Sequence, residues 1–156
     1  MSNIDKILAL TDEIEIIEAV GTSIWDKKQT SNDITLLTDG ERTFVYIDVF
    51  EAAMNEGGFN HFFSSESGNF AQEIKAAYTA IKAPKSALLV EKALGLFPKN
   101  SYVDHLDKRN NLLAKMDDKI FSGWEDLDEI FFNEEQTEDI VDLIVAYIRT
   151  HKNEFN

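Results

Sequence analysis

The chain has 156 residues, of which 44% are hydrophobic, and it contains no cysteine. This composition fits one globular domain and excludes overall disorder, a disulfide framework and a thiolate metal site. The formal net charge of -14 argues against direct binding to nucleic acid or to an anionic membrane, because both need basic groups.

Neither a signal peptide nor a run of about 18 apolar residues is visible, so we expect a cytoplasmic protein. Apolar residues at helical spacing predict a first helix over residues 3–20, which stops at Gly21. A short second helix is expected around Ile24 and Trp25, ending in the polar run 27–32.

The next predicted helix runs from Arg42 to about Glu56, after a turn at residues 38–40. Residues 44–47 also have high strand propensity. We favour a helix because the 3.6-residue period continues beyond them and Gly57 follows as an end signal.

Proline and polar residues mark the helices in the middle of the chain. We expect Asn69, with Gln72, to cap a helix that runs to about Ile81. Pro84 suits the first position of the following helix, and that helix must end before Pro98.

Three further helices are expected in the C-terminal part. Asp104 is predicted to cap a helix that continues to about Ile120 and includes Asp117 and Asp118 near its end. A short helix around Trp124 and a final helix from about Glu138 follow. The pattern predicts an all-α fold of about seven or eight helices, in one compact domain over residues 1–156.

No sequence motif for catalysis, phosphate binding or metal binding is present. His61, His105 and His151 lie far apart, and no two of them have the spacing of a metal pair on one helix. We therefore expect no enzymatic activity, no cofactor and no metal.

His61 follows the glycine-rich break and is the histidine with two possible roles. It could line a small-ligand or catalytic pocket with Asp48, Glu51 or Asn55. Alternatively, the segment is structural: Gly57 ends a helix in a left-handed conformation, and His61 and Asn55 bond exposed helix ends.

The negative charge is concentrated in two blocks. Residues 117–142 hold eleven acidic residues and one lysine, and residues 1–20 hold Asp5, Asp12, Glu13, Glu15 and Glu18. The acidic residues of the larger block are expected to form the partner-binding surface. They are Asp117, Asp118, Glu125, Asp126, Asp128, Glu129, Glu134, Glu135, Glu138, Asp139 and Asp142.

Three interpretations of this acidic block remain open. It could be a solvated face that aids solubility, with the acids at helix starts complementing the helix dipole. It could mimic the phosphates of DNA and occupy the basic groove of a DNA-binding protein. A divalent-cation site at Asp126, Asp128 and Glu129 would need a turn that brings these oxygens together.

The segment between Glu51 and Phe63 combines paired glycines with phenylalanine and with a His-Phe-Phe run. Its distinctive residues are Asn55, Gly57, Gly58, Phe59, His61, Phe62 and Phe63. Together with weaker agreement at Arg109 and elsewhere, they resemble the signature of a bacterial family of acidic DNA-mimic proteins. The conserved domain of that family was long catalogued as one of unknown function. The family-like region runs from about residue 42 to residue 156.

The resemblance implies a helical fold and an acidic homodimer that covers the DNA-binding face of a basic transcription factor. It implies a structural role for the signature residues. An immunity or antitoxin-like inhibitor of a basic nuclease is the alternative with the same physics. A small-ligand domain near His61 and a plain soluble domain are the other two.

Overall fold

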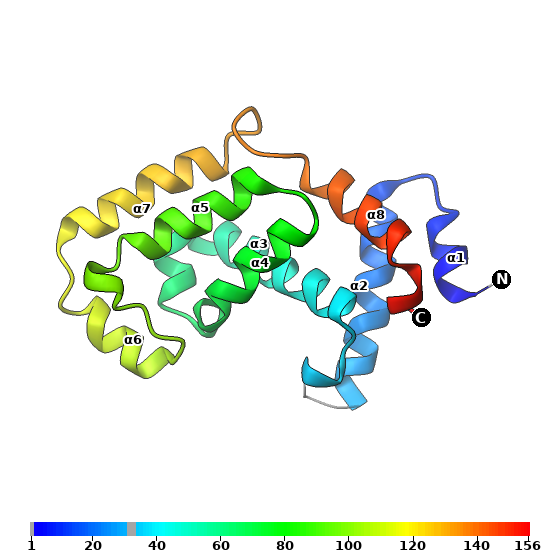
Figure 1. The fold of residues 1–156 in the computed structure, drawn as a ribbon, viewed down its shortest axis with the longest axis horizontal. Helices are drawn as coiled ribbons and strands as arrows, with labels where there is room; N and C mark the ends of the chain where they lie inside the picture. Colours follow the sequence, from blue (N-terminus) through cyan, green and yellow to red (C-terminus); the bar gives the residue numbers. More distant parts are fainter. Residues whose placement is uncertain (1, 31–33) are drawn as a thin grey trace. The chain divides into compact units, whose positions relative to one another are not determined.

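The computed structural model describes residues 2–30 and 34–156, and these form eight α-helices without any β-strand (Figure 1). The predicted all-α fold is confirmed. The chain divides into two compact units, residues 1–45 with 139–156 and residues 46–138. Each unit is described by itself, and the single domain stays a prediction. In the described part of the chain, no helix is long and apolar enough to cross a membrane.

The first unit is built from the two ends of the chain. Helix α1 packs on α2, and α2 packs on α8. The elements are α1 (Asn3–Leu8), α2 (Glu13–Thr30), the 3₁₀ helix η1 (Ile34–Leu36), the start of α3 (Asp39–Phe63), α8 (Ile140–Thr150) and the 3₁₀ helix η4 (Lys152–Glu154).

The predicted helix over residues 3–20 begins correctly at Asn3, but it is interrupted and does not stop at Gly21. The separate short helix expected around Ile24 and Trp25 is part of α2, and the end of the polar run 27–32 lies outside the described residues. The chain breaks after α1, and the Asp12 carboxylate accepts the Ile14 N–H at 2.9 Å to start α2. Helix α2 then continues through Gly21, because Ile16, Val20 and Ile24 lie four residues apart and are all buried. Their burial outweighs the cost of about 1 kcal/mol for a glycine within a helix.

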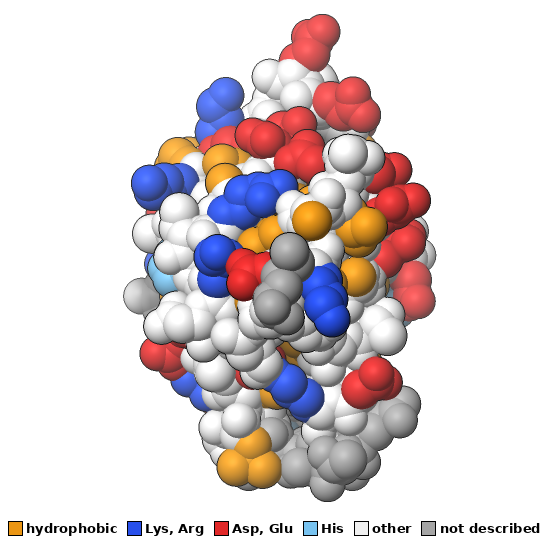
Figure 2. All heavy atoms as spheres, turned by 90° about the vertical axis from the view of Figure 1, so that its right-hand side faces the viewer, with side chains coloured by type: hydrophobic (Ala, Val, Ile, Leu, Met, Phe, Trp, Pro, Cys, Tyr) orange, Lys and Arg blue, Asp and Glu red, His pale blue; other side chains and the backbone are white. Residues whose placement is uncertain are grey.

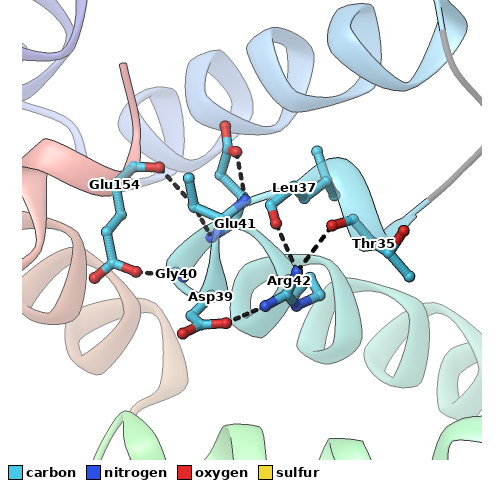
Figure 3. Close-up of polar contacts among 8 residues, drawn as sticks. Thr35, Leu37, Asp39, Gly40, Glu41, Arg42 and Glu154 are labelled. Atoms are coloured by element: carbon cyan, nitrogen blue, oxygen red, sulfur yellow. Dashed lines mark hydrogen bonds and ion pairs between the residues drawn. The ribbon is translucent and has the colours of Figure 1, made fainter.

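Helix α3 begins with a capping box that was not expected (Figure 3). The Thr38 hydroxyl accepts the Glu41 N–H, and the Glu41 carboxylate accepts the Thr38 N–H, both at 3.1 Å. Glu41 is buried and also binds the Lys27 ammonium at 2.6 Å. The Thr-x-x-Glu spacing in the sequence is typical of a capping box and could have predicted it. On the same turn, Glu154 accepts the N–H of Gly40 at 2.9 Å.

The second unit is formed by the middle of the chain. Helix α4 packs on α5, and α5 packs on α7. The elements are the rest of α3, the 3₁₀ helix η2 (Glu66–Phe70), α4 (Ala71–Ala80), α5 (Pro84–Gly95), the 3₁₀ helix η3 (Pro98–Asn100), α6 (Leu106–Leu113) and α7 (Asp118–Phe131).

Proline gave the boundaries of α5 correctly, with Pro84 in its first turn and its end before Pro98. The predicted caps at Asn69 and Asp104 are wrong. Phe70 precedes α4 without a side-chain cap, because the Asn69 side chain binds elsewhere. His105 caps α6 through its Nδ1 atom, which accepts the Lys108 N–H at 3.5 Å.

The predicted helix to Ile120 is also two helices. Helix α6 ends at Leu113, and Asp117 caps α7 by accepting the Lys119 N–H at 2.9 Å. Asp117 and Asp118 therefore start a helix, where negative charge is favourable, and do not end one.

The core of the second unit is an aromatic cluster. Phe59, Phe62 and Phe63 are fully buried. The Phe63 ring stacks on Trp124 with centroids 4.8 Å apart, and Phe50 meets Phe62 edge to face at 5.0 Å. Such pairs add about 0.5–1.5 kcal/mol each beyond simple burial.

Candidate functional site

Gly57 and Gly58 bend α3 within the family-like segment between Glu51 and Phe63. Gly57 is extended, with φ of -175°, and Gly58 takes the positive φ of 71°. The left-handed residue is thus Gly58 and not Gly57. A side chain on Gly58 would clash with the carboxylate of Asp128. That carboxylate accepts the Phe59 N–H at 2.9 Å, at the start of the helix beyond the bend.

Asp128 therefore differs from the other acids of α7 that were expected to form the partner-binding surface. Its side chain is half-buried. Burial raises the pKa of Asp128 and the negative charge of Glu125 adds to this, while the hydrogen bond from Phe59 opposes both. Because this carboxylate holds the bend in α3, we assign Asp128 a structural role.

Arg109 is a charged residue that is fully buried in the second unit. Its guanidinium donates to the carbonyl oxygens of Phe63 at 2.6 Å and Ser65 at 2.7 Å, at the end of α3. It also donates to the carbonyl of Val103 at 3.0 Å and to the Asn69 side chain at 2.9 Å. Carbonyls at the end of a helix have no partner within the helix, and Arg109 supplies one.

His61 lies half-exposed near the end of α3, and its Nε2 atom is 3.0 Å from a Glu56 carboxylate oxygen. Glu51, one of its predicted partners, instead accepts the Tyr78 hydroxyl at 2.9 Å. Burial raises the pKa of Glu51 and of Tyr78, and their part-buried hydrogen bond joins α3 to α4. In these contacts His61 pairs with Glu56 and Glu51 pairs with Tyr78.

Four predicted acids lie on one exposed face of α7, and we name this face the α7 stripe. Asp118, Glu125, Asp126 and Glu129 are exposed, whereas Trp124 and Leu127 on the opposite side are buried. Glu134 and Glu135, just beyond the helix, are exposed as well.

Glu138 forms hydrogen bonds within the second unit. Its carboxylate accepts the Lys85 N–H at 2.5 Å and both the N–H and the hydroxyl of Ser86 at 3.0 Å. Ala83, in the capping position of α5, has no side chain that could do this. Burial works to raise the pKa of Glu138, but these hydrogen bonds outweigh it and lower the pKa.

The last two predicted acids belong to the first unit. Asp139 caps α8 by accepting the Asp142 N–H at 3.2 Å. The pKa of Glu13 is raised by burial and then by the charges of Asp142 and Asp139. Glu13 from the N-terminal acidic block therefore lies near the end of the larger block. Asp5 is neutralised locally, because Lys152 lies 2.9 Å from it.

A groove of about 560 Å³ lies between α1 and α2, and we name it the α1–α2 groove. Ile7 and Ala19 line it together with the acids Glu15, Glu18 and Asp26. Acidic side chains gather along one edge of the face in Figure 2. Glu15 and Glu18 belong to the expected N-terminal acidic block, whereas Asp26 lies outside it although all three residues are on α2.

The described residues contain no group of three histidine, cysteine, aspartate or glutamate side chains that could hold a metal ion. The suggested cation site at Asp126, Asp128 and Glu129 gains no support, because Asp128 points its carboxylate at the bend in α3. The α7 stripe and the acidic residues of the α1–α2 groove each present several carboxylates that could bind a positively charged partner.

Comparison with known proteins assigns a family. A family model described as DMP19-like protein matches residues 35–151. The curated proteins and the solved structures contain no match. The matched region starts at η1, whereas α1 and α2 precede it, and it agrees with the family-level resemblance expected from about residue 42. The chain belongs to the DMP19-like protein family.

Proposed function

We propose that this chain is a DNA mimic that occupies the DNA-binding face of a basic protein through the α7 stripe. Membership of the DMP19-like family is consistent with this role. The observation that carries the proposal is that Asp118, Glu125, Asp126 and Glu129 are all exposed on one helix.

The charge density of the α7 stripe supports the comparison with DNA. From residue 118 to residue 129 a helix rises about 17 Å, at about 1.5 Å per residue. Four carboxylates over that length have a mean axial spacing of about 5.5 Å, which is of the same order as the spacing of about 3.4 Å between phosphates along one strand of duplex DNA. A groove that accepts phosphates by Lys and Arg contacts could accept this array.

The proposed partner is a transcription factor, and the proposed active form is a homodimer that presents two such stripes. In this proposal the protein acts by binding alone and not by catalysis. Asp128 and Glu138 contribute by holding the backbone, because their carboxylates bond Phe59 and the start of α5.

Capture from a lysate of the source cells tests the proposal. We expect the wild-type chain, at about 50 mM salt where screening is weak, to retain a DNA-binding protein that duplex DNA displaces. The variant Glu125→Gln/Asp126→Asn/Glu129→Gln should lose it. A control, Glu66→Gln/Glu73→Gln/Asp107→Asn, removes three exposed charges elsewhere in the same unit and should retain it.

Two results would contradict the proposal. Equal losses in both variants would mean that net charge, and not the α7 stripe, attracts the partner. Capture of a nuclease in place of a transcription factor would favour the inhibitor of a basic nuclease.

A further inference from the structure

The connection between α5 and α6 has backbone and side-chain features that cost free energy. Lys99 and Asn100 take positive φ angles of 55° and 56°, in a left-handed turn that the Ser101 N–H closes by donating to the Pro98 carbonyl at 3.1 Å. Asparagine and glycine tolerate this conformation, but a lysine clashes with its own backbone. The Ser101 hydroxyl oxygen is buried without a hydrogen-bond partner among the described residues. Both features favour a second conformation, in which the turn relaxes and the hydroxyl meets water.

The next two residues hold this connection against the rest of the second unit. The Tyr102 hydroxyl donates to the Gly68 carbonyl at 2.6 Å, and the Val103 carbonyl accepts from the Arg109 guanidinium at 3.0 Å. The guanidinium carbon lies 6.0 Å from the centre of the Tyr102 ring. Residues 98–103 therefore form a strap over Arg109, which we name the Arg109 strap. Its first half is strained, and its second half makes the contacts that hold it in place.

Aromatic contacts join the Arg109 strap to α7. The Tyr102 ring meets Phe63 and Phe97 edge to face, with centroids 6.2 Å and 5.7 Å away. Both phenylalanine rings pack in turn on Trp124, with centroids 4.8 Å and 5.4 Å away. Trp124 is the fully buried residue of α7. Tyr102 thus belongs to the aromatic cluster on which α7 packs, and its departure would weaken that packing.

We propose that the Arg109 strap opens and closes in the folded protein and that its opening loosens α7. In the open state Tyr102 and Val103 leave their partners, and the strain at residues 99–101 is released. Local opening of this kind exposes backbone amides to exchange with solvent. The motion belongs to the second unit and does not depend on whether the α7 stripe binds a partner.

Hydrogen exchange of the full chain, followed by mass spectrometry, tests the proposal. Tyr102→Phe removes the hydrogen bond to Gly68 and keeps the ring. It should speed exchange in the Arg109 strap and in α7 about fivefold, the effect of one lost hydrogen bond. Exchange in α8, which lies in the other unit, should stay as in the wild type. The matched control Tyr147→Phe removes a hydroxyl from α8 and should leave the strap and α7 unchanged.

Two other variants should favour the closed strap. Lys99→Asn suits the left-handed turn, and Ser101→Ala removes the buried hydroxyl that has no partner. Each should slow exchange in the Arg109 strap and in α7 about threefold or more. Lys99→Gln is the control, because it removes the same charge as Lys99→Asn without suiting the turn, and it should leave exchange unchanged.

Four results would overturn the proposal. Unchanged exchange in Tyr102→Phe would mean that the strap does not open, and equally faster exchange in α8 would mean that the whole fold is weakened. A response confined to the strap would remove the link to α7. Faster exchange in Lys99→Asn or Ser101→Ala would show that these side chains hold the strap closed and that residues 99–101 are not strained.

Discussion

At the scale of single residues, Arg109 is a charge that folding has removed from water. Its four hydrogen bonds go to Phe63, Ser65, Val103 and Asn69. Each buried carbonyl left without a donor costs about 1–3 kcal/mol. We expect Arg109→Met to lower the free energy of unfolding by about 3 kcal/mol or more, measured by urea denaturation.

Lys108→Met is the matched control, because it removes a positive charge from an exposed neighbour on the same helix. Its effect should stay within about 0.5 kcal/mol. Equal effects at the two positions would show that the buried hydrogen bonds of Arg109 contribute little to stability.

Asp128 and Asp126 stand two residues apart on α7 and should behave differently. Asp128 accepts the Phe59 N–H at the start of the helix beyond the bend, and Asp126 is exposed. Loss of a comparable helix cap costs about 0.5–2 kcal/mol. Asp128→Ala should therefore lower the thermal midpoint, whereas Asp126→Ala should leave it unchanged. The same midpoint for both variants would argue against a structural role for Asp128.

At the scale of elements, the start of α5 depends on Glu138. The pKa of this carboxyl is below its usual 4.5, so the charged form stabilises the fold. Its contribution is present above pH 4.5 and is lost as the pH falls through the lowered pKa. We expect Glu138→Gln to reduce stability at pH 7 and to flatten the decline at acidic pH. Denaturation curves between about pH 3 and pH 7 would show this.

Glu135→Gln provides the comparison for Glu138, because it removes one charge from an exposed side chain close by. It should retain the wild-type pH dependence. An unchanged acid decline in Glu138→Gln would mean that α5 does not draw stability from this carboxylate.

The bend in α3 and the end of α5 make a contrasting pair of glycines. Gly58 has a positive φ, and any side chain there would clash with Asp128. Gly95 has no atom within 4 Å of the position of a side chain. Gly58→Ala should destabilise the fold by several kcal/mol in calorimetry, and Gly95→Ala should be neutral or stabilising by up to about 1 kcal/mol. A tolerated Gly58→Ala would contradict the described bend.

Helix positions could be predicted from the sequence where the signal is local. Pro84 and Pro98 bound α5 correctly, because proline restricts its own and the preceding residue. The break at the paired glycines was also expected. Gly21 was misread as a stop, since the burial of its neighbours on α2 is a tertiary effect that outweighs glycine's propensity.

The site could be predicted only in part, for the same reason. Glu125, Asp126 and Glu129 were expected at a surface, and they are exposed. The structural use of Asp128 was not expected, because its partner Phe59 lies 69 residues away in the chain. Glu138 and Ser86 are 52 residues apart. The sequence alone does not distinguish an acidic residue that hydrogen-bonds a distant backbone group from one that is exposed on the surface.

At the scale of the whole molecule, the net charge of -14 opposes folding through self-repulsion. Salt screens this repulsion, with a Debye length of about 30 Å at 0.01 M and about 10 Å at 0.1 M. We expect the thermal midpoint to rise by several degrees between about 10 mM and 500 mM NaCl. Scanning calorimetry at pH 7 measures it directly.

The triple variant Glu125→Gln/Asp126→Asn/Glu129→Gln reduces the repulsion at its densest point, so its midpoint should depend less on salt. It should equal or exceed the wild-type midpoint at low salt, because these exposed side chains hold no internal contact comparable to that of Asp128. If the α7 stripe lowers the stability of the free protein, its presence fits a role in binding a partner. A midpoint that falls in the variant at every salt concentration would show that these acids stabilise the fold and are not kept for a partner.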